Sequence, residues 1–224
     1  GSYLSTPSFS GLAAGTYVYK IKDANNCTKD TSLTITMPTP ITANYSITNL
    51  LCYGANTGAL TSVASGGTSP YQYALGSGSY AATSMFTGLV AGTYVYKIED
   101  ANNCTKDTTL TITSPTQLHI VVNAIVNVSC SGLSNGSITL NANGGTPVYK
   151  FSINGGTYSV SNSFSGLSAG SYLISAKDSN NCTHDTTISI TQPSSLAANV
   201  TITSPLCFGD ANGSYAVMAS GGTT

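Results

Sequence analysis

Apolar and polar residues alternate in short runs along the whole chain, and turn-forming residues separate the runs. In 93–99, for example, Tyr94, Tyr96 and Ile98 share one side of an extended segment, and polar residues occupy most of the other side. A period of two residues indicates a β-strand with one buried face. The runs end at Gly, Pro and Asn residues every 8–12 residues or so. The pattern therefore predicts an all-β protein of short strands.

The same pattern returns at an interval of about 78 residues. The stretch 15–30 recurs with one substitution at 92–107, and more loosely at 170–185. An interval this long accommodates one small β-domain per copy. We therefore expect a half repeat, two complete repeats and a second half repeat, at 1–37, 38–115, 116–193 and 194–224.

Seven or so short strands per repeat predict an immunoglobulin-like β-sandwich. In repeat 38–115, strand A is expected over 41–47 and an A–B loop over 49–56. Strands B, C, F and G then follow over 58–64, near 71–75, over 93–99 and up to 113. The sequence at the start of strand F resembles a tyrosine corner, in which the tyrosine hydroxyl donates a hydrogen bond to the backbone a few residues earlier. The predicted core includes Tyr94, Tyr96, Ile98, Tyr172 and Ile174.

Four motifs of repeat 38–115 together resemble a known family. They are Cys52-Tyr53-Gly54 and the segments 66–71, 88–94 and 100–105. Their combination is similar to the SprB-type repeat, which occurs in tandem in surface adhesins of Bacteroidetes, typified by the gliding-motility adhesin SprB. The resemblance covers the whole chain. It implies export through the type IX secretion route and a cell-surface or extracellular location, but not that this protein drives gliding.

Composition excludes several other functions. Only 7% of the residues are charged and the net charge is −1, which gives no reason to expect nucleic acid or an anionic membrane surface as a partner. Insertion of this segment into a membrane is not expected either. No apolar run reaches the roughly 20 residues that a membrane-spanning helix needs. Thirteen of the fifteen charged residues lie on the three F–G hairpins. These charges are expected to be solvated and to form Lys–carboxylate pairs across the strands.

No arrangement of residues in the sequence points to catalysis or to a cofactor. His119 and His184 occupy different positions of one repeat and recur in no other copy, so neither has a matched partner. Asp100 and Asn102 are weak calcium candidates, because they offer two or three oxygens where calcium takes six to eight. Residues 103–105 match an N-glycosylation sequence. The sequence thus predicts a protein that is not an enzyme and has no cofactor.

The six cysteines fall at two fixed places in each repeat. Three lie in F–G turns and three in A–B loops, namely Cys27, Cys104 and Cys182, and Cys52, Cys130 and Cys207. An even number at regular spacing favours disulfides formed in an oxidising compartment.

Strand directions limit how these cysteines pair. In such a sandwich the A–B loop and the F–G turn lie at opposite ends, roughly 20 Å apart for a seven-residue strand. A disulfide needs Cα atoms within about 7 Å. Pairing within one repeat is therefore difficult, whereas Cys52 points at the next repeat, whose F–G turn carries Cys182. We predict an inter-domain Cys52–Cys182 disulfide, with the other four cysteines pairing to repeats outside the chain. The alternative is Cys52–Cys104 with Cys130–Cys182.

The linkers at 37–40 and 114–116 are short and contain proline, which stiffens them. With disulfides between neighbours, the predicted architecture is a head-to-tail, semi-rigid rod. The predicted function is a non-enzymatic extracellular stalk or filament. Its expected partners are neighbouring repeats of the same chain, further copies in a fibre, and a polysaccharide or other surface ligand. The alternatives are a glycan- or protein-binding module that uses exposed A–B loops, with Tyr53 and Phe208 facing the ligand, and a stalk for a hydrolase elsewhere in the parent protein.

Overall fold

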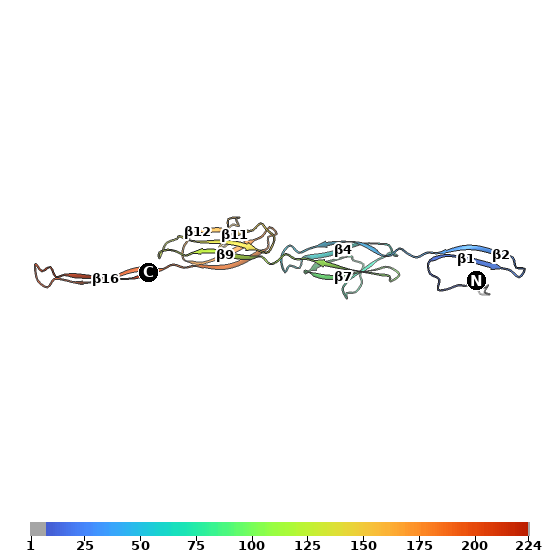
Figure 1. The fold of residues 1–224 in the computed structure, drawn as a ribbon, viewed down its shortest axis with the longest axis horizontal. Coiled ribbons are helices and arrows are strands. Elements are labelled where there is room, and N and C mark those ends of the chain that lie inside the picture. The colour runs from blue at the N-terminus through green and yellow to red at the C-terminus, as the bar shows by residue number, and fades with distance from the viewer. Residues whose placement is uncertain (1–7, 224) are drawn as a thin grey trace. The chain divides into compact units, whose positions relative to one another are not determined.

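The computed structural model describes residues 8–223, and every regular element in this part of the chain is a β-strand (Figure 1). The chain divides into two compact units. One comprises the chain up to Ile47 with Ala59–Thr87 and Thr93–Thr111; the other comprises Thr48–Gly58, Gly88–Gly92 and the chain from Ile112. Nothing in the described part forms a helix that could cross a membrane.

The first sandwich consists of two three-stranded sheets. One has the order β3-β4-β6, from Thr42–Thr48, Gly58–Ser65 and Met85–Leu89, and the other β5-β7-β8, from Gln72–Leu75, Gly92–Glu99 and Thr105–Ile112. Leu60, Tyr96 and Ile98 are inaccessible to solvent between them. The buried hydroxyl of Tyr96 accepts a 3.0 Å hydrogen bond from Ser62 and donates one to the carbonyl of Ser84.

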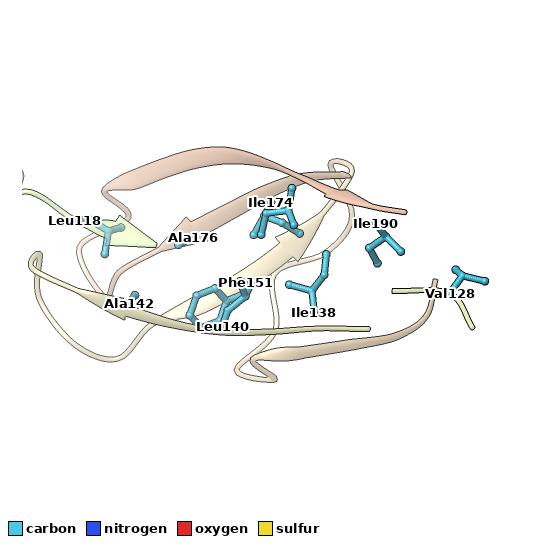
Figure 2. Packing of buried hydrophobic residues seen from close by; sticks show 10 residues of the cluster. Leu118, Val128, Ile138, Leu140, Ala142, Phe151, Ile174, Ala176 and Ile190 are labelled. Atoms are coloured by element: carbon cyan, nitrogen blue, oxygen red, sulfur yellow. The ribbon is translucent and has the colours of Figure 1, made fainter. Parts of the chain in front are cut away.

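The second sandwich repeats this arrangement. Its sheets have the orders β12-β10-β9 and β11-β13-β14, from Ser163–Leu167, Gly136–Asn143 and His119–Val126, and from Lys150–Ile153, Gly170–Lys177 and Thr183–Ile190. Ile138, Leu140 and Ile174 are fully buried, and Figure 2 shows how the apolar side chains gather between the strands. A bulge interrupts the pairing of β9 with β10 between Val122 and Ala124, and β9 is one residue longer than β3.

The two flanking segments form hairpins. Strands β1 (Gly15–Lys22) and β2 (Thr28–Ile35) pair antiparallel, as do β15 (Ser194–Thr203) and β16 (Ser214–Gly222). Almost all of their residues are exposed. By position in the repeat, the first is an F–G hairpin and the second an A–B hairpin.

The predicted all-β fold of tandem sandwich repeats is confirmed, and so is the tyrosine corner. Tyr17 donates to the carbonyl of Ala13 at 2.8 Å, and Tyr172 to that of Ser168 at 2.9 Å. Of the predicted core residues, Tyr96, Ile98 and Ile174 are fully buried, whereas Tyr94 and Tyr172 are only partly buried. Tyr172 reaches the rim because its hydroxyl is used in the corner. The repeat boundaries predicted from the sequence interval stay a prediction.

Candidate functional site

The candidate site is built on the turn between β13 and β14, which presents Cys182. The carboxylate of Asp178 accepts backbone N–H groups from Asn180 and Cys182, both at 2.9 Å, and from Thr146 at 2.8 Å. Asn181 has a φ of 66°, a left-handed conformation that asparagine tolerates better than most residues. Asp178 is only 3% exposed. The turn is therefore fixed from inside by one buried carboxylate.

Strand β10 is followed by a glycine pair that makes room for this carboxylate. Gly145 has a φ of 55°, and a Cβ there would lie 2.7 Å from Oδ2 of Asp178. At Gly144 a Cβ would lie 1.8 Å from the carbonyl oxygen of Gln117. A larger residue would collide with the Gln117 backbone at the first position and with the Asp178 carboxylate at the second, which explains why each repeat has Gly-Gly at this place.

The equivalent turn of the first sandwich has the same construction. Asp100 accepts N–H groups from Asn102, Cys104 and Thr68, all at 2.9 Å, and is 4% exposed. These hydrogen bonds hold the pKa of the Asp100 carboxyl below its ordinary value, and the bond from the Cys104 N–H has the largest effect. Desolvation of the carboxyl acts in the opposite direction and raises the pKa. The expectation that Asp100 is solvated is therefore wrong.

This use of Asp100 also argues against calcium at the turn. Both carboxylate oxygens already accept backbone N–H groups, and the amide of Asn102 donates to Oγ1 of Thr68 at 3.0 Å. The solvated cross-strand pair that the sequence predicts is seen elsewhere on such a hairpin, where Lys20 and Asp30 are 2.8 Å apart.

A disulfide joins Cys182 to Cys52, with Cα atoms 5.5 Å apart and a sequence separation of 130. The loop Thr48–Gly58, which contains Cys52, belongs to the same compact unit as the sandwich from Ile112 onward. Next to the disulfide, the side-chain amide of Asn180 donates to the carbonyl of Leu51 at 3.2 Å and to Thr146 Oγ1 at 3.0 Å. The loop is thus bound to the turn covalently and by a hydrogen bond.

A cavity of about 340 Å³ lies beside the disulfide. Its lining consists of Cys52, Tyr53, Thr116, Gln117, Leu118, Gly145, Asn181, Cys182 and Thr183. A cavity of about 500 Å³ occupies the equivalent place at Cys130, where Ser131 and Ser195 share a 3.0 Å hydrogen bond and Gly132 N donates to Gln192 at 2.9 Å. The two places differ in that no F–G turn covers Cys130 among the described residues.

The other four cysteines, Cys27, Cys104, Cys130 and Cys207, are exposed and make no disulfide among the described residues. Chiefly through its negative charge, Asp100 raises the pKa of the Cys104 thiol. A thiol with a raised pKa is less often present as the thiolate, which is the form that attacks a disulfide. The predicted ligand-facing residues are also exposed: Tyr53 to 61%, at the rim of the first cavity, and Phe208 completely.

One feature of the site region was missed by the sequence reasoning. His119 and His184, which had no evident partner, have ring centres 5.2 Å apart. They are 65 residues apart in sequence, and only the packing of β9 beside β14 brings them together. The available signal was that strands A and G are neighbours at the edge of such a sandwich, so that histidines near the start of each strand meet.

The comparison with family models agrees with the motifs. A family model described as SprB repeat matches residues 44–79 and 122–158, and the resemblance found in the sequence is confirmed. The search of curated proteins found no match. One solved structure that the chain resembles is a C-terminal 282-residue fragment of intimin in complex with the intimin-binding domain of the translocated intimin receptor. The identity is 17% and the TM-score 0.36, over 73% of this chain and 67% of that chain. A likeness this distant says nothing about function.

Proposed function

We propose, from the premise that residues 44–79 and 122–158 are SprB repeats, that the chain is a load-bearing segment of a non-enzymatic surface protein. The family supports the coarser part of this statement, an adhesin-type repeat region of a surface or extracellular protein. The finer part is that the repeats form a semi-rigid stalk or filament that holds another element away from the cell. Type IX export belongs to the same proposal.

The observation that carries the proposal is the Cys52–Cys182 disulfide. It closes a loop of 130 residues that contains most of both sandwiches. Tension applied at the two ends of the chain would pass through the S–S bond and not through the backbone of that loop. In a stalk, such a link directly limits extension.

The surroundings of the disulfide support a stiff connection. The Asn180–Leu51 hydrogen bond fixes the loop beside the bond, and the linker at 114–116 is short and contains Pro115. Short proline-containing linkers restrict bending. Each added contact reduces the number of orientations that one repeat can adopt toward the next.

The four remaining cysteines fit the same scheme. Cys27 and Cys104 lie in F–G turns, as Cys182 does, and Cys130 and Cys207 lie in A–B loops, as Cys52 does. In a longer array we propose that each A–B cysteine bonds to the F–G cysteine of the following repeat. Successive loops would then overlap, so that no repeat is joined to the next by the backbone alone.

Electron microscopy of the native material tests this function. Straight rods or ordered fibres that become flexible on reduction are expected. Strings that bend freely at every repeat, with or without a reducing agent, would contradict a semi-rigid stalk. Non-reducing peptide mapping of the same material gives the cysteine pairs directly.

A second candidate is a binding module, and the observation that favours it is the exposure of aromatic residues in the A–B loops. Phe208 is fully exposed, and Tyr53 is 61% exposed at the rim of a 340 Å³ cavity. Aromatic faces of this kind stack on sugar rings. A glycan array separates the two candidates: binding that is lost in Tyr53→Ala and Phe208→Ala variants would favour the module, whereas absence of binding would leave the stalk.

A further inference from the structure

The histidine pair of the second sandwich has a geometry that a shared ligand would explain. His119 is the first residue of β9 and His184 the second residue of β14. Their ring centres are 5.2 Å apart and their planes are inclined by 63°. The pair therefore bridges the two sheets at the edge where strands A and G meet.

One nitrogen of this pair lacks a partner. Nδ1 of His184 is buried and makes no hydrogen bond within the described residues 8–223. Buried polar atoms are almost always satisfied in folded proteins, because an unsatisfied one retains its desolvation penalty. A ligand that binds this nitrogen would remove the penalty. His119, by contrast, is exposed, so the side of the pair that it forms is open to solvent.

The distance between the rings suits a metal ion. A coordinating nitrogen lies about 1.1 Å from its ring centre and a zinc–nitrogen bond is about 2.0–2.1 Å, so a bound ion lies roughly 3.2 Å from each centre. If one nitrogen of each ring points at the same ion, two centres 5.2 Å apart subtend an angle of about 110° at that ion. This is the tetrahedral angle that zinc prefers.

We propose that His119 and His184 form a binding site for a divalent transition-metal ion, with Zn²⁺ as the reference ion. Imidazole nitrogen is a ligand for zinc, copper and nickel, whereas calcium and magnesium take oxygen. The described residues contain no cluster of three or more His, Cys, Asp or Glu side chains suited to a metal. The pair therefore supplies two ligands, and water completes the coordination.

The other sandwich lacks the site. The equivalent positions there are Thr42 and Lys106, and a lysine ammonium repels a cation. The difference confines the metal to one repeat of the two and supplies substitutions that the fold already accommodates. Residues 116–118 and 181–183, which immediately precede the two histidines, line the cavity beside the disulfide. Bound metal would tie together the chain segments on both sides of that cavity, a stiffening role that rests on the proposed function.

Isothermal calorimetry and thermal unfolding of the chain with Zn²⁺ test the site. The exposed thiols are first alkylated with the disulfide intact, because free cysteines also bind zinc. One Zn²⁺ per chain and a raised melting temperature are expected. His119→Thr and His184→Lys, which carry the residues of the other repeat, should each weaken binding by at least about tenfold, since each removes one of two protein ligands.

Two results would overturn the proposal: no binding at millimolar Zn²⁺, or binding that neither substitution changes. Imidazole nitrogen shifts in NMR spectra of the alkylated protein identify the ligating atoms independently of stability. The stalk function is measured without metal, by electron microscopy and by force. Its failure would leave the metal site standing, and failure of the metal site would leave the stalk.

Discussion

Reduction of the Cys52–Cys182 disulfide should lengthen the chain under tension by a calculable amount. In the oxidised chain, force that enters at the N-terminal side reaches Cys52, crosses the S–S bond and leaves from Cys182. The backbone between them carries no load, even when the sandwiches inside the loop unfold. Only reduction, or replacement of the cysteines, allows that segment to extend.

The magnitude follows from the covalent structure alone. The loop spans 130 residues, and a fully extended chain reaches at most about 3.3–3.6 Å per residue. The disulfide therefore hides roughly 430–470 Å of contour length. The remaining 94 of the 224 residues give the oxidised chain a limit of roughly 310–340 Å. The reduced chain should reach more than twice that length.

Single-molecule force spectroscopy with handles at the two termini measures both lengths. The oxidised protein should stop at the shorter limit, and a reducing agent should release the longer one. The matched control is the Cys52→Ser, Cys182→Ser double variant, which should reach the full length without reduction and show no change when the agent is added. Alkylation of the free thiols beforehand prevents new disulfides.

An oxidised chain that extends as far as the reduced one would refute the reasoning. A different outcome is equally informative: release in two steps of about 52 residues each would show that the alternative pairs, Cys52–Cys104 and Cys130–Cys182, form instead. The experiment thus separates the two ways of pairing that the sequence left open.

Three further predictions concern the stability of individual repeats. Tyr96→Phe should destabilise the first sandwich by about 1–3 kcal/mol, because it removes the partner of the buried Ser62 hydroxyl and of the partly buried Ser84 carbonyl. Differential scanning calorimetry should then show a melting temperature lower by at least about 4 °C for that repeat alone. Asp178→Ala should reduce the yield of the 52–182 disulfide peptide on oxidative refolding, since three N–H groups lose their acceptor, whereas the exposed Asp185→Ala should not. Because folding lowers the pKa of Asp100, its carboxylate stabilises the folded state above the ordinary pKa of 3.8, and this stabilisation is lost as the pH falls through the lower folded-state pKa. In acid melts, the stability of Asp100→Asn should therefore depend less on pH below 3.8 than that of the unchanged protein. An unchanged slope would contradict this.

The strands and the core could be predicted because they depend on local patterns. Alternation placed Tyr96 and Ile98 on the buried face of β7, and the repeat interval transferred the prediction to Ile174. The direction of each strand then followed from the order of the sandwich, which was enough to propose a partner for Cys52. No contact between distant residues had to be known for these steps.

The burial of Asp100 and the meeting of His119 with His184 could not be predicted in the same way. A count of charges says that a hairpin is polar, but not that the N–H groups of its own turn point inward at the carboxylate. The bulge in β9 and the packing of β9 beside β14 are tertiary features, and they decide which side chains meet. For Asp100 the missing step was to relate the turn to the Gly-Gly bend that passes beside it.

The three F–G turns show that the disulfide does not create the turn that presents its cysteine. Asp23 accepts N–H groups from Asn25 at 2.9 Å and from Cys27 at 2.8 Å, as the aspartates of the other two turns do. Yet Cys27 makes no disulfide among the described residues, whereas Cys182 does. The aspartate thus sets the conformation, and the cysteine is held in position before any partner arrives. Because a preorganised group loses little entropy on bonding, each copy of the repeat carries a turn already suited to an A–B cysteine of a neighbour.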